Sequence, residues 1–190
     1  MTIATKKYVE ELQHSVQTAA LNFNIWWVYK SEATRPKYIN ELNRYPLFFQ
    51  TSIHAHFVAL LIALYGLYET RKDTYNIPDL LKKLRADSML PTDTLDSIQL
   101  IYDRAKPIWV KVSILRNDAF GHRSKAHTVE DVFKSAGVSP NELKLLVELT
   151  EELLNEVTLH LFDATHAFNL DGTRDTVRML EDLRRLYEKD

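Results

Sequence analysis

The chain has 190 residues and a formal net charge of −2, with 45% hydrophobic and 26% charged residues. This length suits one domain, residues 1–190, that buries its own hydrophobic core. The sequence contains no cysteine, which excludes disulfides, thiolate metal sites and a cysteine nucleophile. It has only 4 glycines and 6 prolines, and this scarcity argues against both disorder and a turn-rich all-β fold.

Apolar residues recur with helical spacing along the chain, and no stretch shows the strict alternation of a strand. Ser139-Pro140-Asn141-Glu142 is a strong helix start, because Ser caps, Pro takes the first turn and Glu reaches back to the cap. We expect Pro107 to kink the helix that contains it. The expected helices cover residues 5–31, a short piece after Pro36, 46–70, 79–86, 94–121, a short piece between Thr128 and Gly137, 140–167, and Asp171-Gly172 to the C-terminus. The fold class is therefore all-α.

Residues 46–68 lack any Asp, Glu, Lys or Arg and are long enough to cross a bilayer. Polar residues between Gln50 and His56 interrupt the first half and leave about a dozen apolar residues, the length of a buried core helix. No secretory signal opens the chain, and neither a second span nor a basic flank supports insertion. We expect a cytoplasmic protein that does not enter a membrane.

The expected helix over 94–121 carries a narrow apolar stripe that ends in a histidine. Its members follow alternating steps of three and four and are Ile98, Ile101, Ala105, Ile108, Val112, Leu115, Ala119 and His122. Between Arg104 and His127 the chain holds six lysines and arginines and one acidic residue, a net charge of +5 on a chain whose total is −2. Such a patch either attracts polyanions or forms an ordinary solvated face.

Arg116 and His122 lie within this basic segment. Cleaving RNA without a metal needs a group that takes the 2′-hydroxyl proton and a cation that stabilises charge on the phosphoryl oxygens. Histidine and arginine are suited to these two tasks. On an ideal helix the two side chains lie about 120° apart around the axis and about 9 Å along it. They converge only if the helix ends at Gly121 or if two copies of the chain meet.

The end of this helix resembles the Arg-x4–6-His signature of the HEPN superfamily, in which a polar residue commonly follows the Arg. The matching residues are Leu115-Arg116-Asn117-Asp118-Ala119-Phe120-Gly121-His122-Arg123-Ser124. They are similar to the AbiU-type abortive-infection branch, as are the upstream segments Leu67-Tyr68-Glu69-Thr70-Arg71 and Ile77-Pro78-Asp79-Leu80-Leu81. The resemblance implies an HEPN-like up-and-down helical bundle with short additional helices.

The resemblance also implies a metal-independent endoribonuclease that acts as a toxin or phage-defence effector and requires no cofactor. Family members commonly form homodimers in which two motif helices face each other. By this likeness Arg116 stabilises the transition state, His122 is the general base or acid, and Asn117 orients Arg116 or the phosphate. The products are a 2′,3′-cyclic phosphate and a 5′-hydroxyl. Some members carry a tyrosine two positions after the His that a partner enzyme modifies; Ser124 stands there in this chain.

Several alternatives stay open. Candidates for RNA phosphate contacts are Lys111, Arg123, Lys125 and His127, which otherwise serve only solubility. Tyr102 and Trp109 either contact a base or a partner or, as aromatic residues of small bundles usually do, pack in the core. No histidine pair has metal-binding spacing, so we expect no metal site. The rival to a nuclease is a non-catalytic helical module that binds nucleic acid or an acidic protein partner. For the nuclease we expect RNA as the partner, together with a second copy of the chain and an antitoxin or neighbouring defence protein.

Overall fold

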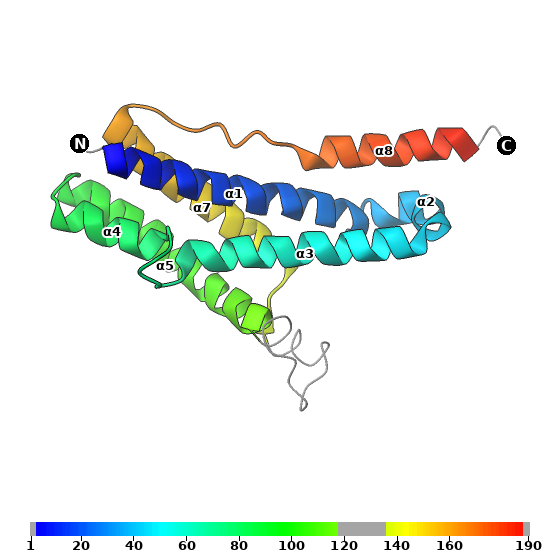
Figure 1. The fold of residues 1–190 in the computed structure, drawn as a ribbon, viewed down its shortest axis with the longest axis horizontal. Helices are drawn as coiled ribbons and strands as arrows, with labels where there is room; N and C mark the ends of the chain where they lie inside the picture. The colour runs from blue at the N-terminus through cyan, green and yellow to red at the C-terminus, as the bar shows by residue number, and fades with distance from the viewer. Residues whose placement is uncertain (1–2, 118–135, 188–190) are drawn as a thin grey trace.

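The computed structural model describes residues 3–117 and 136–187. Within these ranges every regular element is helical, as expected for an all-α protein. The long helices run side by side, with α8 along one half of α1 (Figure 1). In chain order the elements are α1 (Ile3–Lys30), the 3₁₀ turn η1 (Arg35–Tyr38), α2 (Ile39–Arg44), α3 (Pro46–Tyr68), α4 (Ile77–Ala86), α5 (Thr92–Leu115), α7 (Pro140–Phe162) and α8 (Gly172–Tyr187).

The predicted start of α7 is confirmed at atomic detail. The Ser139 hydroxyl accepts a hydrogen bond from the backbone N–H of Glu142, whose carboxylate accepts one from the Ser139 N–H in return. The predicted end is wrong, because α7 stops at Phe162 rather than near residue 167. Asp163 adopts a left-handed conformation with φ of 52°, which terminates the helix.

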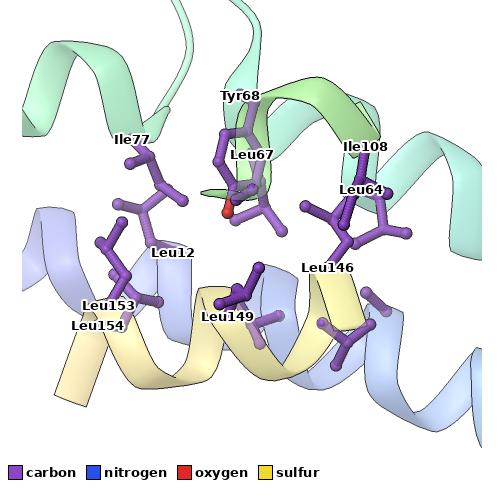
Figure 2. Close-up of a cluster of buried hydrophobic side chains, with 14 of the residues drawn as sticks. Leu12, Leu64, Leu67, Tyr68, Ile77, Ile108, Leu146, Leu149, Leu153 and Leu154 are labelled. Carbon is purple, nitrogen blue, oxygen red and sulfur yellow. The ribbon is translucent and has the colours of Figure 1, made fainter. Parts of the chain in front are cut away.

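The main hydrophobic core lies between α1, α3, α4, α5 and α7. Figure 2 shows side chains from these helices meeting at its centre, with Leu12 of α1, Leu64 of α3 and Ile108 of α5 facing the leucines of α7. The apolar stripe predicted on α5 is buried from Ile98 to Leu115. One polar pair lies inside this core: the Tyr68 and Thr150 hydroxyls are 2.7 Å apart, and Thr150 also donates to the Leu146 carbonyl at 2.6 Å.

A smaller hydrophobic cluster holds α8 to the far end of α1. Its buried members are Val28, Tyr29, Tyr38, Leu42, Phe49 and Leu180. The Arg184 guanidinium donates to the buried Glu41 carboxylate at 2.9 Å and lies 4.9 Å from the centre of the Tyr38 ring. At the start of α8, Gly172 packs so closely on α1 that a Cβ atom there would lie 2.8 Å from a methyl group of Leu21.

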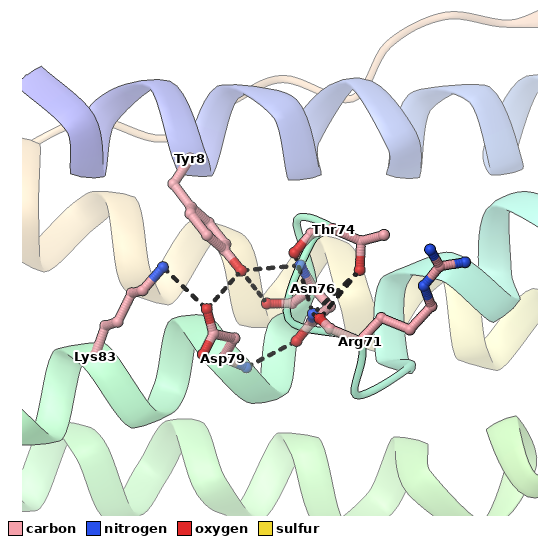
Figure 3. A network of polar contacts seen from close by, with 6 residues as sticks. All are labelled: Tyr8, Arg71, Thr74, Asn76, Asp79 and Lys83. Carbon is pink, nitrogen blue, oxygen red and sulfur yellow. Dashed lines mark hydrogen bonds and ion pairs between the residues drawn. The ribbon is translucent and has the colours of Figure 1, made fainter.

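The turn between α3 and α4 is fastened to α1 by a polar network (Figure 3). The buried Asn76 side chain accepts from the Asp79 N–H at 2.9 Å, which caps α4, and donates to the Arg71 carbonyl at 2.9 Å. The Asn76 backbone N–H donates to the Tyr8 hydroxyl at 3.0 Å. Lys83 pairs with Asp79 at 2.9 Å and lies 4.3 Å from the Tyr8 ring centre.

Among the described helices, α3 alone is long and apolar enough to cross a membrane by length and composition, with a mean hydropathy of 1.7. Its second half supplies core residues, as the sequence suggests. Exposed apolar residues occur in both halves: Leu47 and Phe48 in the first are 79% and 62% exposed, and Ile62 in the second is 56% exposed. Only 28% of the most apolar window is buried. The uncharged helix therefore supplies core residues and also carries apolar side chains on the surface.

Candidate functional site

The described part of α5 ends at the residues that the sequence singles out. Leu115 is the last residue of the regular helix and is fully buried. Arg116 and Asn117 follow in a wider, π-type turn and are half-buried. The Arg116 N–H contacts the carbonyls of Val112 and Ser113. The buried stripe that ends at Leu115 thus places Arg116 at the edge of the core. At Arg116 and Asn117 the structure has a π-type turn in place of the regular helix that the sequence predicts.

The Arg116 side chain lies on an aromatic ring of another helix. Its guanidinium carbon is 4.6 Å from the ring centre of Tyr65 on α3, a cation–π contact. Its Nη1 donates to the Asn117 side-chain oxygen at 2.9 Å. No acidic side chain within residues 3–117 and 136–187 forms an ion pair with Arg116. Its positive charge therefore remains uncompensated in this part of the chain.

Tyr65 belongs to a group of aromatic residues between α3 and α5. Its ring centre lies 6.1 Å from that of Trp109, with 30° between the ring planes. The Trp109 indole N–H donates to the Tyr65 carbonyl at 3.2 Å. Tyr102 stacks on the buried Tyr68 at 5.8 Å. Tyr102 and Trp109 therefore pack as core residues, one of the two alternatives that the sequence leaves open for them.

Lys111 is not a free cation. Its ammonium group contacts the Glu142 carboxylate at 2.5 Å and the Gly137 carbonyl at 3.1 Å. The hydrogen bond from Lys111 is the largest cause that lowers the pKa of Glu142 below its ordinary value, and the Ser139 N–H adds to it. Lys111 thus joins α5 to the first turn of α7, a structural contact that spacing along one helix does not predict.

His122, Arg123, Lys125 and His127 lie outside the described residues. The distance from Arg116 to His122 and the convergence of the two side chains remain predictions for this reason. The short helix expected between Thr128 and Gly137 falls mostly in the same range; Ala136, at its end, is buried in the main core. The candidate site is thus described on its arginine side.

The histidines of the described residues do not form a metal site. No group of three or more His, Asp or Glu side chains within these residues is placed to hold a metal ion. His56 contacts the Asn22 side-chain oxygen at 2.8 Å, and burial lowers its pKa. His160 lies 3.6 Å from Glu156 on α7, and His166 contacts Gln17 of α1. These histidines have structural partners on one or two helices.

A hollow of about 500 Å³ lies between the N-terminal part of α1 and the C-terminal part of α7. Val9, Leu161 and Phe162 form its apolar lining, and Lys6 and Glu10 are among its polar residues. Residues 158–162 of α7 are more than four helical turns beyond Glu142, which marks the Arg116 end, a distance of about 25 Å along the helix. The hollow is therefore separate from the site that the sequence indicates.

Comparison with known protein families shows which family the chain belongs to. The family model HEPN_AbiU2, described as AbiU2, matches residues 3–188. The chain belongs to the AbiU2 family. It is an HEPN-type protein of the abortive-infection kind, and the helical fold and the resemblance seen in the sequence are both confirmed. No curated protein and no solved structure matches the chain.

In this AbiU2-family chain, the contact most easily overlooked from sequence is that of Tyr65. It lies on a helix whose composition indicates core, and its sequence separation from Arg116 carries no periodic signal. A weak signal exists, because Tyr65 and Tyr68 place two phenol rings at the end of an otherwise mostly aliphatic stretch. Only the packing of α3 against α5 shows which of the two meets the arginine.

Proposed function

We propose that this AbiU2-family protein is a metal-independent endoribonuclease that acts as a toxin or phage-defence effector. The 2′-hydroxyl of RNA attacks the adjacent phosphorus and leaves a 2′,3′-cyclic phosphate and a 5′-hydroxyl. Arg116 stabilises the charge that develops on the phosphoryl oxygens. His122 accepts the 2′-hydroxyl proton or donates one to the leaving oxygen. Asn117 orients Arg116, and the 2.9 Å contact between their side chains supports this role.

The proposal depends on the positive charge and the hydrogen-bond donors of the Arg116 guanidinium. A phosphate-binding arginine must keep in-plane N–H donors and positive charge available. The Arg116 guanidinium lies over the Tyr65 ring and donates to the neutral amide of Asn117, while no carboxylate among the described residues neutralises it. Lys111, four residues upstream of Leu115, shows the contrast, because its charge is matched by Glu142. Of these two cations, Arg116 is the better phosphate ligand.

The proposal includes a second copy of the chain. Arg116 and His122 are separated by about 9 Å along the axis of an ideal helix, which is too far for one scissile phosphate without a turn in the chain. A homodimer with the two motif segments facing each other supplies each Arg116 with a His122 from the partner. Arg123, Lys125 and His127 then contact the RNA backbone. We place the protein in the cytoplasm, with an antitoxin or neighbouring defence protein as its regulator.

The test is cleavage of a mixed RNA pool in EDTA by purified wild type, His122→Ala and Arg116→Gln, with analysis of the RNA ends and solution mass. We expect wild type to leave 2′,3′-cyclic phosphates and both variants to lose cleavage while keeping the helical circular dichroism. His160→Ala on α7 is the matched control, since it removes a histidine whose described ion pair lies within α7, and should cut as wild type does.

Two outcomes contradict the proposal. Equal cleavage by His122→Ala assigns the activity to something other than the proposed site. RNA binding that weakens with salt, without products from any tested pool, instead supports the non-catalytic binding module. The basic segment from Arg104 to His127 serves both functions, so binding alone does not separate them.

A further inference from the structure

Trp109, Tyr65 and Arg116 lie in a row at the end of α5, with the Tyr65 ring in contact with the other two side chains. Trp109 lies on α5 and Arg116 follows directly after its last residue, seven positions further on, which is about 10 Å along the axis at helical spacing. The ring of Tyr65, from α3, contacts both: its centre is 6.1 Å from the indole and 4.6 Å from the guanidinium carbon. One aromatic ring fits the space between the two side chains, and Tyr65 fills it.

The position of Tyr65 is fixed by its own backbone. Its carbonyl accepts the Trp109 indole N–H at 3.2 Å and also the backbone N–H of Glu69 at 3.1 Å, at the point where α3 ends. Trp109 is partly buried against the main core. The ring on which Arg116 rests is therefore anchored to both helices.

Stacking and phosphate binding use different parts of a guanidinium. A cation–π contact needs the cation over the ring face, whereas phosphate binding uses the five N–H donors, which lie in the guanidinium plane and point outward. Asn117 accepts from Nη1, and no other described residue accepts a hydrogen bond from the Arg116 side chain. A phosphate needs two parallel N–H donors along one edge of the plane. Among the described residues, only Asn117 accepts a hydrogen bond from this side chain, and the Tyr65 ring restricts where the guanidinium can lie.

We infer that Tyr65 is a positioning residue of the nuclease site, which holds the Arg116 plane so that its free edge faces the RNA phosphate. The inference rests on the proposed function only in the choice of ligand. The ring, rather than the hydroxyl, does this, because the Tyr65 hydroxyl has no hydrogen bond among the described residues. Tyr65→Phe therefore keeps the ring that contacts Arg116, whereas Tyr65→Leu removes the ring but keeps an apolar side chain.

The first measurement is single-turnover RNA cleavage in EDTA. A cation–π contact at a partly desolvated site is worth enough to change the rate by about tenfold to thirtyfold. We expect Tyr65→Leu to lose that much and Tyr65→Phe to stay close to wild type. In the Arg116→Gln background, where cleavage is expected to be lost, Tyr65→Leu should cause no further loss of affinity for a short oligoribonucleotide, because the residue it positions is absent. Tyr75→Leu, a half-exposed tyrosine beside Tyr8, is the control and should cleave normally.

The second measurement does not depend on activity. The Arg116 side-chain N–H resonance in an NMR spectrum should be shifted upfield by the Tyr65 ring current, remain so in Tyr65→Phe and move to the ordinary arginine position in Tyr65→Leu. If wild type fails to cleave RNA, the proposed function is lost, and the positioning role is then read from this signal and from affinity for a short oligoribonucleotide. An unshifted wild-type signal overturns the inference, as does equal cleavage and binding by Tyr65→Leu and wild type.

Discussion

Lys111 and Glu142 connect α5 to α7 through an ion pair with 2.5 Å between Nζ and Oε1. The same ammonium donates to the Gly137 carbonyl, and the same carboxylate accepts from the Ser139 N–H. Both side chains are partly buried, at 37% and 29% exposure, so water screens the pair less than it screens the pairs on the open helix faces. The contact holds the end of α5 to the start of α7.

Lys111→Met should lower the free energy of unfolding by about 1 kcal/mol at neutral pH. The hydrogen bond from Lys111 lowers the pKa of Glu142. The contribution of the pair to the free energy of unfolding is therefore present above the ordinary pKa of 4.5 and is lost as the pH falls through the lowered pKa. The difference between variant and wild type should thus shrink as the pH is lowered below 4.5, as measured by urea unfolding followed by tryptophan fluorescence. RNA affinity should fall less than in Arg116→Gln.

Lys144→Met is the control for this prediction. Its ion pair with Glu148 lies on one face of α7 with exposures of 61% and 53%, so its loss should change stability by no more than about 0.5 kcal/mol. A Lys111→Met protein as stable as Lys144→Met would show that the contact between α5 and α7 contributes nothing measurable.

Asn76→Ala should destabilise the fold by about 2 to 4 kcal/mol, because it removes the cap of α4 and the buried donor to the Arg71 carbonyl together. Asn76→Asp should not rescue it, since a carboxylate caps the helix but cannot donate to that carbonyl. Ser139→Ala, at an exposed cap, should cost only about 1 kcal/mol. Thermal unfolding of the three variants ranks them, and equal losses for the two alanine variants would contradict the prediction.

The buried hydroxyl pair of Tyr68 and Thr150 should respond unequally to the loss of either member. Thr150→Val leaves the fully buried Tyr68 hydroxyl without its partner and should cost about 1 to 3 kcal/mol. Tyr68→Phe should cost less, because the Thr150 hydroxyl still donates to the Leu146 carbonyl. The double variant should be less destabilised than the two single losses together. Denaturant unfolding of all four proteins measures the coupling, and simple additivity would contradict it.

Glu151→Gln should stabilise the protein at alkaline pH. Burial, and then the charge of Glu148, raise the pKa of Glu151 to about 7. A raised pKa means that stability is complete below the unfolded value of 4.5 and is lost as the pH rises through 7. After allowance for solvent screening, we expect a gain of about 1 kcal/mol at pH 8 and none near pH 4. Urea unfolding at both values checks this; equal gains at the two values would contradict it.

The fold was predictable to the extent that its signals are local. The Ser139 capping box and the apolar stripe from Ile98 to Leu115 need only the spacing of residues on one helix, and both appear in the structure. The end of α7 was not predictable in this way. Periodic residues continue past Phe162, and the helix ends because Asp163 takes a left-handed conformation, which an aspartate adopts only in some contexts.

The sequence predicts those residues of the site that their chemical type and their place in one segment single out. The sequence points to Arg116 and Asn117, whose side chains do contact each other. It points equally to Lys111, because a lysine that binds phosphate and a lysine that binds Glu142 look alike in one sequence. Tyr65 gave only a weak signal in the sequence, because the residue it contacts lies beyond the end of another helix. Contacts between helices depend on the packing of the core, which no single segment encodes.

The attachment of α8 gives the molecule two hydrophobic bodies of unequal size. Leu180 packs into the small cluster with Val28 and Phe49, whereas α1, α3, α4, α5 and α7 share the large one. We therefore expect α8 to unfold locally while the other helices stay folded. Amide hydrogens in residues 172–187 should then exchange with deuterium sooner than those along α7. Local unfolding of α8 would leave the main core intact, and Arg116 would keep its contact with Tyr65.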